Sequence, residues 1–157
     1  MSRSADPQDL FRLWEKLRGK PFGKRIFSRI VGKMAPYTGT IRAEVLEFSP
    51  GYARVQMRDR RLLRNHLRSV HAVALINLGE VTTGIATMSL VPSGGRGIVT
   101  GLSMEYRKKS RGTITCECHT SLPPGSGSLD AVVEGILRDA SGDTVAIARA
   151  EWRLAIP

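Results

Sequence analysis

The chain has 157 residues, with 24 Lys and Arg against 14 Asp and Glu, a formal charge of +10 and a pI near 10.4. Its length suits one packed domain and is too short for two. The positive charge favours an anionic partner: nucleic acid, a membrane surface or a phosphorylated small molecule. Aromatic residues make up only 6% of the chain, and no basic strip carries the aromatics that stack on bases, so we expect no nucleic acid partner.

Secreted, disulfide-linked and zinc-binding proteins are also not favoured. Residues 1–10 contain no apolar run, so we expect no secretory signal or N-terminal anchor, and a cytoplasmic location. Cys116 and Cys118 would lie on the same face of a strand, which does not support a disulfide framework. The run from Cys116 to His119 lacks a second Cys or His pair at ligand spacing, so we expect no metal site.

Residues 1–36 predict a helical N-terminal extension. Asp6 is a candidate cap, Pro7 suits the first helical position, and Asp9 makes the first turn acidic. A second helix is expected after the break at 19–23, with an apolar stripe opposite a basic one. Its apolar positions are Phe22, Ile26, Phe27, Ile30, Val31 and Met34, and its basic positions are Lys20, Lys24, Arg25, Arg29 and Lys33. We interpret these helices as packing elements with one wet face, while a membrane-surface role near lipid-like substrates stays open.

A two-residue period begins at Thr40 and predicts a hairpin with one wet face, turning at Ser49-Pro50-Gly51. Its alternating apolar positions are Ile41, Ala43, Val45, Ala53, Val55 and Met57. A mostly polar and basic connection over 59–69 leads to an apolar segment from Val70 to Val91.

This apolar segment is long enough to cross a membrane, but Glu80 lies at its centre. A charge at that depth costs roughly 2.5 to 3.5 kcal/mol, and Asn77 and several threonines add polarity, so we expect no stable membrane insertion. A helix buried inside the protein fits the pattern better.

Four more strands are expected after the turn at 92–95, roughly over 98–108, 113–122, 129–138 and 144–154. Two strands, one buried helix and four strands predict an α+β domain over 37–157, in which an antiparallel sheet wraps around the helix. Such a sheet leaves open edges, and pairing two copies edge to edge would satisfy them.

The residues before and within the predicted helix resemble a known family. Asn65, His71 six residues later and Glu80 nine residues after that match the spacing in hotdog thioesterases of the PaaI and 4-hydroxybenzoyl-CoA thioesterase type. The resemblance covers about Thr40 to Ile156 and implies a hotdog fold and hydrolysis of an acyl-CoA thioester. One departure is that the family's His-Gly-Gly is here His71-Ala72-Val73.

Helix geometry places His71 and Glu80 on opposite sides of the helix, because nine residues give about half a turn of net rotation and roughly 13 Å of rise. If they serve one site, the helix start of one subunit must meet the middle of the helix of another. The resemblance also implies such a homodimer, and two dimers could associate further into a homotetramer.

The resemblance and the chemistry assign candidate roles in this shared site. The free N–H groups of Ala72 and Val73 at the helix start could form an oxyanion hole. Glu80 could act as general base on water or as nucleophile, and its apolar surroundings should raise its pKa. Asn65 could orient the carbonyl or the water, and Thr83 could hold that water.

Each of these residues also has a purely structural interpretation. A buried Glu80 could form a salt bridge, Asn65 could form a turn, and Thr83 could simply pack. His71 is expected to fix the loop or the helix start rather than to transfer protons.

A basic segment, Arg107, Lys108, Lys109 and Arg111, is expected at the end of a strand. It could clamp the phosphates of coenzyme A or serve as a solvated edge that resists aggregation. Coenzyme A would belong to the substrate, and we expect no other cofactor.

Two other functions stay open. A hotdog hydratase or dehydratase is suggested by the fourteen residues between His66 and Glu80, although the Pro- and Gly-rich stretch normally between them is missing. A non-enzymatic acyl-CoA sensor would use the basic helices to contact nucleic acid or a protein partner.

Overall fold

The computed structural model describes residues 6–157. Residues 1–5 of the predicted helical extension therefore lie outside the described residues. They are also the first half of the segment 1–10, in which we expected no secretory signal. The helices are α1 (Pro7–Leu17), α2 (Gly23–Met34), α3 (Pro36–Gly39) and α4 (Ala72–Met88), with a 3-10 helix at Arg61–Leu63. The strands are β1 (Glu44–Ser49), β2 (Tyr52–Met57), β3 (Arg96–Tyr106), β4 (Ile114–His119), β5 (Gly127–Arg138) and β6 (Thr144–Ile156).

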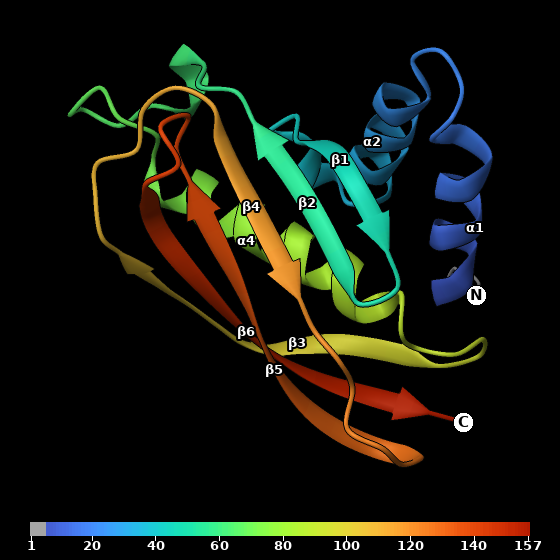
Figure 1. Cartoon of the computed structure of the whole chain (residues 1–157). Helices are drawn as coiled ribbons and strands as arrows, with labels where there is room; N and C mark the ends of the chain where they lie inside the picture. Colours follow the sequence, from blue (N-terminus) through green and yellow to red (C-terminus); the bar gives the residue numbers. More distant parts are fainter. Residues whose placement is uncertain (1–5) are drawn as a thin grey trace.

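These six strands form one antiparallel sheet in the order β1-β2-β4-β5-β6-β3. The sheet curves around α4, while α1 and α2 lie beside β1 at one end (Figure 1). The predicted α+β arrangement, a sheet wrapped around one long helix, is therefore confirmed. The hairpin and the four later strands are also present, because turn residues interrupt each run of alternating side chains.

The central helix α4 packs closely on the sheet. Its apolar sequence leaves Leu78 fully buried and Leu75 and Ile85 almost so. At Gly79 the helix approaches β6 so closely that an added Cβ would lie 2.4 Å from the Cβ of Ala148. A side chain at position 79 would therefore push the helix off the sheet.

Helices α1 and α2 are held against β1 by an aromatic cluster. Asp6 caps α1 as predicted, since its carboxylate accepts the N–H of Gln8 at 2.9 Å. Trp14 and Phe27 are buried with ring centroids 5.1 Å apart, and each lies 6.1 Å from the ring of Phe48 in β1. Burying side chains of this size stabilises by roughly 1.5 to 3 kcal/mol each, which fixes the helices to the sheet.

The segment before β1 differs from the sequence prediction. The strand begins at Glu44 rather than at Thr40, because the short helix α3 continues into a turn. The carbonyl of Gly39 accepts the N–H of Arg42, whose φ of 49° is left-handed. Ile41 is 2% exposed, so the alternation that suggested a strand reflects burial beneath this turn.

Phe22 also differs from its expected place in the apolar stripe of the second helix. It is the N-cap of α2, with a left-handed φ of 58°, and its side chain is 72% exposed. A cap residue lies outside the helical backbone geometry, so its side chain does not continue the helical stripe.

Strand β3 ends the sheet and pairs only with β6 in the described part of the chain. None of its residues is buried, and the large apolar side chains of Ile98 and Leu102 are 65% and 38% exposed. A long edge strand with unpaired backbone groups and apolar side chains is suited to pair with another chain.

Candidate functional site

One face of α4 is left open by its own chain. It carries a stripe of partly or fully accessible residues three or four positions apart, which makes them neighbours along a helix. We call this set the α4 stripe: Val73, Ile76, Glu80, Gly84 and Met88.

Glu80 is the only charged residue of the α4 stripe and lies at its middle. Its carboxylate forms no hydrogen bond or ion pair with any residue from 6 to 157. Burial raises the pKa of this carboxyl above its ordinary value, in the direction predicted from the sequence. The structural alternative, a salt bridge to one of the abundant basic residues, is therefore not formed within the described chain.

The start of α4 offers one free backbone donor. The Nδ1 atom of His71, the helix cap, accepts the N–H of Val73 at 3.1 Å. The His71 carbonyl accepts the N–H groups of Ala74 and Leu75. The N–H of Ala72 has no hydrogen-bond acceptor among residues 6–157. Of the two N–H groups predicted to form the oxyanion hole, Ala72 and Val73, only that of Ala72 is therefore free to donate to a ligand.

Asn65 shapes the loop that precedes α4. Its Oδ1 atom accepts the backbone N–H groups of Leu67 and Ser69 at 2.9 and 3.2 Å, and the Ser69 hydroxyl at 3.1 Å. This is the turn-forming role that the sequence left open. The Nδ2 group donates no hydrogen bond within residues 6–157, so it is free to donate to a ligand.

Thr83 does not face an open space. It is fully buried, and its hydroxyl lies 2.9 Å from the carbonyl of Gly79 and 3.0 Å from that of Glu80, to which it donates. The packing alternative therefore fits this residue, and the predicted water-holding role does not, because the hydroxyl proton is already used by the helix.

The basic segment after β3 divides into two pairs. Arg107 lies 2.9 Å from Glu105, and Lys108 forms ion pairs with Asp139 and Asp143. Within the described chain, the exposed side chains of Lys109 and Arg111 form no ion pair. Only the second pair keeps its charge free for an anion.

Two hydrogen bonds bring this segment to the start of α4, and a third joins the start of α4 to the loop before it. The Tyr106 hydroxyl donates to the Ala72 carbonyl at 3.2 Å, and the N–H of Val70 donates to the Ser110 carbonyl at 2.8 Å. The N–H of His71 donates to the Leu63 carbonyl at 2.7 Å. Asn65, His71, Ala72 and the basic segment thus gather at one end of α4, whereas Glu80 lies further along the helix on its other side, roughly 13 Å of rise away.

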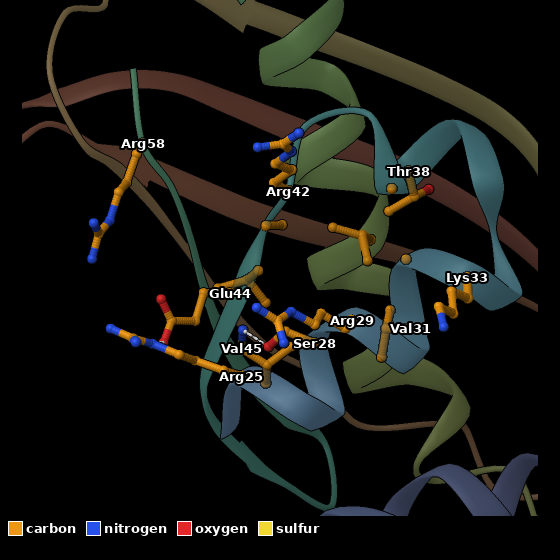
Figure 2. Close-up of a pocket in the computed structure, with 15 residues that line it drawn as sticks. Arg25, Ser28, Arg29, Val31, Lys33, Thr38, Arg42, Glu44, Val45 and Arg58 are labelled. Carbon is orange, nitrogen blue, oxygen red and sulfur yellow. Dashed lines mark hydrogen bonds and ion pairs between the residues drawn. The ribbon is translucent and has the colours of Figure 1, made fainter. Parts of the chain in front are cut away.

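A pocket of about 680 Å³ lies between α2, α3 and the β1–β2 hairpin, with Val81 of α4 in its wall (Figure 2). We call it the N-terminal pocket. Its lining includes none of the residues that the sequence predicted to be functional. It is therefore a second region, separate from the α4 stripe and from the start of α4.

Metal ligands do not gather anywhere in residues 6–157, where no group of three His, Cys, Asp or Glu side chains could hold an ion. Cys116 and Cys118 are buried and unbridged on the same face of β4. Over the same residues, no helix combines the length and apolar character needed to span a bilayer.

Comparison of the sequence with protein families gives one match, a family described as a domain of unknown function, DUF4442, over residues 23–154. The chain belongs to this family. The DUF4442 match begins at the first residue of α2, so it includes the second helix of the predicted extension. No protein with a curated description matches the sequence.

Solved structures resemble this DUF4442 chain closely in fold. A crystal structure of the genomics target APC5556 has a TM-score of 0.79 at 28% identity, covering 96% of this chain and 99% of that one. PA5026 from Pseudomonas aeruginosa, a protein of unknown function called a probable thioesterase, has a TM-score of 0.75 at 22% identity over 87% and 96%. The E. coli PaaI protein from the phenylacetic acid degradation operon has 0.67 at 15% over 82% and 91%. The hotdog fold implied by the resemblance is confirmed.

The N-terminal pocket of this DUF4442 chain was not predicted from the sequence. The signal was the basic face of the second helix, with Arg25, Arg29 and Lys33, which we interpreted as a solvated surface. Nothing in the spacing showed that β1 and β2 would bring further arginines to the same place, because that proximity arises only when the helix packs on the hairpin.

Proposed function

We propose that this protein hydrolyses an acyl-CoA thioester to a free acid and coenzyme A, with Glu80 as general base or nucleophile. The observation that carries the proposal is the carboxyl group of Glu80, which is partly buried, without a partner in residues 6–157, and raised in pKa. A partly buried acid without a partner destabilises the fold, and groups with shifted pKa values of this kind are concentrated at functional sites. The similarity in fold to proteins called thioesterases supports the same activity.

A second copy of the chain would complete the site. Glu80 and the start of α4 lie on opposite sides of one helix, so a single subunit cannot bring them to the same carbonyl. The open edge of β3, with Ile98 and Leu102 exposed, supports pairing of two copies along this strand. The functional unit that we propose is therefore a homodimer, with a dimer of dimers as a possible larger form.

The chemistry follows from the free groups at each end. The Ala72 N–H and the Asn65 Nδ2 group donate to the thioester oxygen as it gains charge, while His71 positions the helix start through its cap. The Glu80 carboxylate takes a proton from water, the water oxygen bonds to the carbonyl carbon, and the carbon–sulfur bond breaks. The proton then passes to the thiolate of coenzyme A. In the nucleophilic route, a Glu80 oxygen attacks the carbonyl carbon and the carbon–sulfur bond breaks, which releases the thiolate of coenzyme A. Water then hydrolyses the resulting anhydride to the free acid and restores the Glu80 carboxylate, and the proton left over passes to the thiolate.

Lys109 and Arg111 are the cations that we propose for the phosphates of coenzyme A. Both are exposed and form no ion pair in the described chain, and hydrogen bonds place their segment beside the start of α4. Arg107 and Lys108 are already neutralised by acidic neighbours, so we assign them a structural role.

Thiol release from a panel of acyl-CoA substrates tests the activity. Changing Glu80→Gln should lower the rate by about a hundred- to ten-thousand-fold, the range expected for loss of a general base. The exposed Glu134 gives a matched control, Glu134→Gln, which should keep wild-type activity. Equal rates for wild type and Glu80→Gln would remove Glu80 from the mechanism, and hydration of an enoyl-CoA without thiol release would indicate a hydratase instead.

Mixing two inactive variants tests the shared site. A Glu80→Gln subunit keeps an intact helix start, and an Asn65→Ala subunit keeps an intact Glu80. Random re-association makes about half of the dimers mixed, each with one intact site of two, so activity should return to about a quarter of the wild-type value. Unmixed variants should stay inactive, and no recovery on mixing would contradict a site built from two subunits.

A further inference from the structure

The N-terminal pocket has a strongly basic rim. Arg25, Arg29 and Lys33 come from α2, Arg42 precedes β1, and Arg58 follows β2. Figure 2 shows these side chains arranged around the space between α2 and the hairpin.

The cations of this pocket outnumber its acids. Glu44 is the one acidic residue in the lining, and its contact with Arg25 is long, at 3.9 Å. Within residues 6–157, Arg42 and Arg58 form no ion pair. Burial and the nearby charge of Arg42 lower the pKa of Arg60, which shows that cations are crowded at this end. A surface on which cations outnumber acids in this way attracts an anion.

Arg42 and Arg58 mark the place where an anionic group would lie. Both line the N-terminal pocket and, with Arg60, a smaller hollow of about 230 Å³, and Glu44 is the one acid that the two hollows share. Arg42 also has the left-handed φ of 49°, an uncommon conformation for a residue other than Gly, Asn or Asp. Guanidinium groups bind carboxylates through two parallel hydrogen bonds.

The inner wall of the pocket is apolar. Its accessible part is formed by Val31 and Ala43, which are half-buried, whereas the other lining valines, Val45, Val55 and Val81, are 2%, 0% and 8% exposed. Thr38 also lines the pocket at 7% exposure, and its hydroxyl has no hydrogen-bond partner in the described chain. No aromatic side chain is present in the lining, so a nucleotide base would find nothing to stack on.

We propose that the N-terminal pocket binds a free fatty acid, with its carboxylate at the basic rim that includes Arg42 and Arg58 and its alkyl chain against the apolar wall. The volume lies within the range of about 300 to 1,000 Å³ that is usual for small-molecule sites. The site is separate from Glu80 and does not depend on the thioesterase proposal. It gives the basic face of α2 a function, because this helix closes one side of the pocket.

Titration calorimetry with laurate as the probe tests the site. Laurate should bind the wild-type protein, and dodecanol, which has the same chain without the charge, should bind about tenfold more weakly or less. The double variant Arg42→Gln with Arg58→Gln should weaken laurate binding by about tenfold or more. A matched control, Arg96→Gln with Arg138→Gln, removes the same charge from residues outside the pocket and should bind laurate as the wild type does.

A second variant tests the apolar wall without changing charge. Ala43→Phe adds a ring to the lining and should weaken laurate binding while circular dichroism shows the same fold. Laurate binding that is unchanged in both pocket variants would overturn the proposal. So would a pocket that binds adenosine 3′,5′-bisphosphate in place of laurate, because the ligand would then be a nucleotide phosphate.

Discussion

The two sides of α4 differ in the sign of the charged residues that lie beside them. On the α4 stripe a single acid, Glu80, lies among apolar residues with no cation to pair with it in residues 6–157. One residue further along, Val81 faces the N-terminal pocket, where five cations meet one acid. A protein with a net charge of +10 has many cations that could neutralise Glu80, and none from residue 6 onward does so.

The difference teaches where to look for ligands. Glu80 is half-buried, so the lack of a counter-charge is costly there, whereas the cations of the N-terminal pocket are exposed and outnumber their single acid, which attracts an anion. Separate binding roles on the two sides account for both. The two sides should therefore be separable by mutation.

The largest expected effect is a double dissociation between the two sides. Glu80→Gln should lower thiol release by about a hundred-fold or more and leave laurate affinity unchanged. Arg42→Gln with Arg58→Gln should weaken laurate binding and leave the rate at saturating substrate unchanged. Both quantities are measured on both proteins, and loss of both functions in either one would mean that the two sides form a single site.

The sheet-facing side of α4 gives the next effect, because it holds both regions in place. Gly79→Ala should destabilise the protein by about 1 to 3 kcal/mol, since its Cβ would lie 2.4 Å from that of Ala148. Gly84→Ala, in the α4 stripe, should have a smaller effect, because the added Cβ would meet only the edge of the Trp152 ring, at 3.3 Å. Urea unfolding measures both, and equal stabilities would show that the contact at Gly79 relaxes freely.

The basic segment after β3 should show a weaker effect. Lys109→Gln with Arg111→Gln should raise KM for acyl-CoA by about three- to tenfold and leave kcat nearly constant, because exposed phosphate contacts act mainly on binding. Arg107→Gln with Lys108→Gln is the matched comparison, since these cations already have acidic partners. A larger rise in KM for the second pair would reverse our assignment.

The smallest effect concerns stability against pH. Because the folded state raises the pKa of Glu80, its ionisation destabilises the fold above that pKa, and the penalty is absent below the pKa of the unfolded chain. Glu80→Gln should therefore melt at a higher temperature than wild type near about pH 8 and at the same temperature near about pH 4. Calorimetric scans at both values check this, and a lower melting temperature for the variant near neutral pH would contradict an unpaired buried acid.

Much of the fold follows from local patterns. The period of two predicted the hairpin and the later strands, and Asp6 and Pro7 predicted the start of α1. The boundary before β1 was wrong because α3 and the left-handed turn at Arg42 depend on contacts with α2 and the hairpin, which a linear pattern does not contain.

Sequence alone determined which residues are chemically unusual: an acid at the centre of an apolar helix and a His and Asn at set distances before it. Only the tertiary structure decided which of them are free to act. It used the Thr83 hydroxyl and the Val73 N–H within the helix and left Glu80 and the Ala72 N–H without partners in the described chain. It also brought arginines from α2, from the turn before β1 and from the end of β2 around one pocket. Spacing along a chain fixes the face and order of side chains, whereas hydrogen-bond partners and burial depend on which segments meet in space.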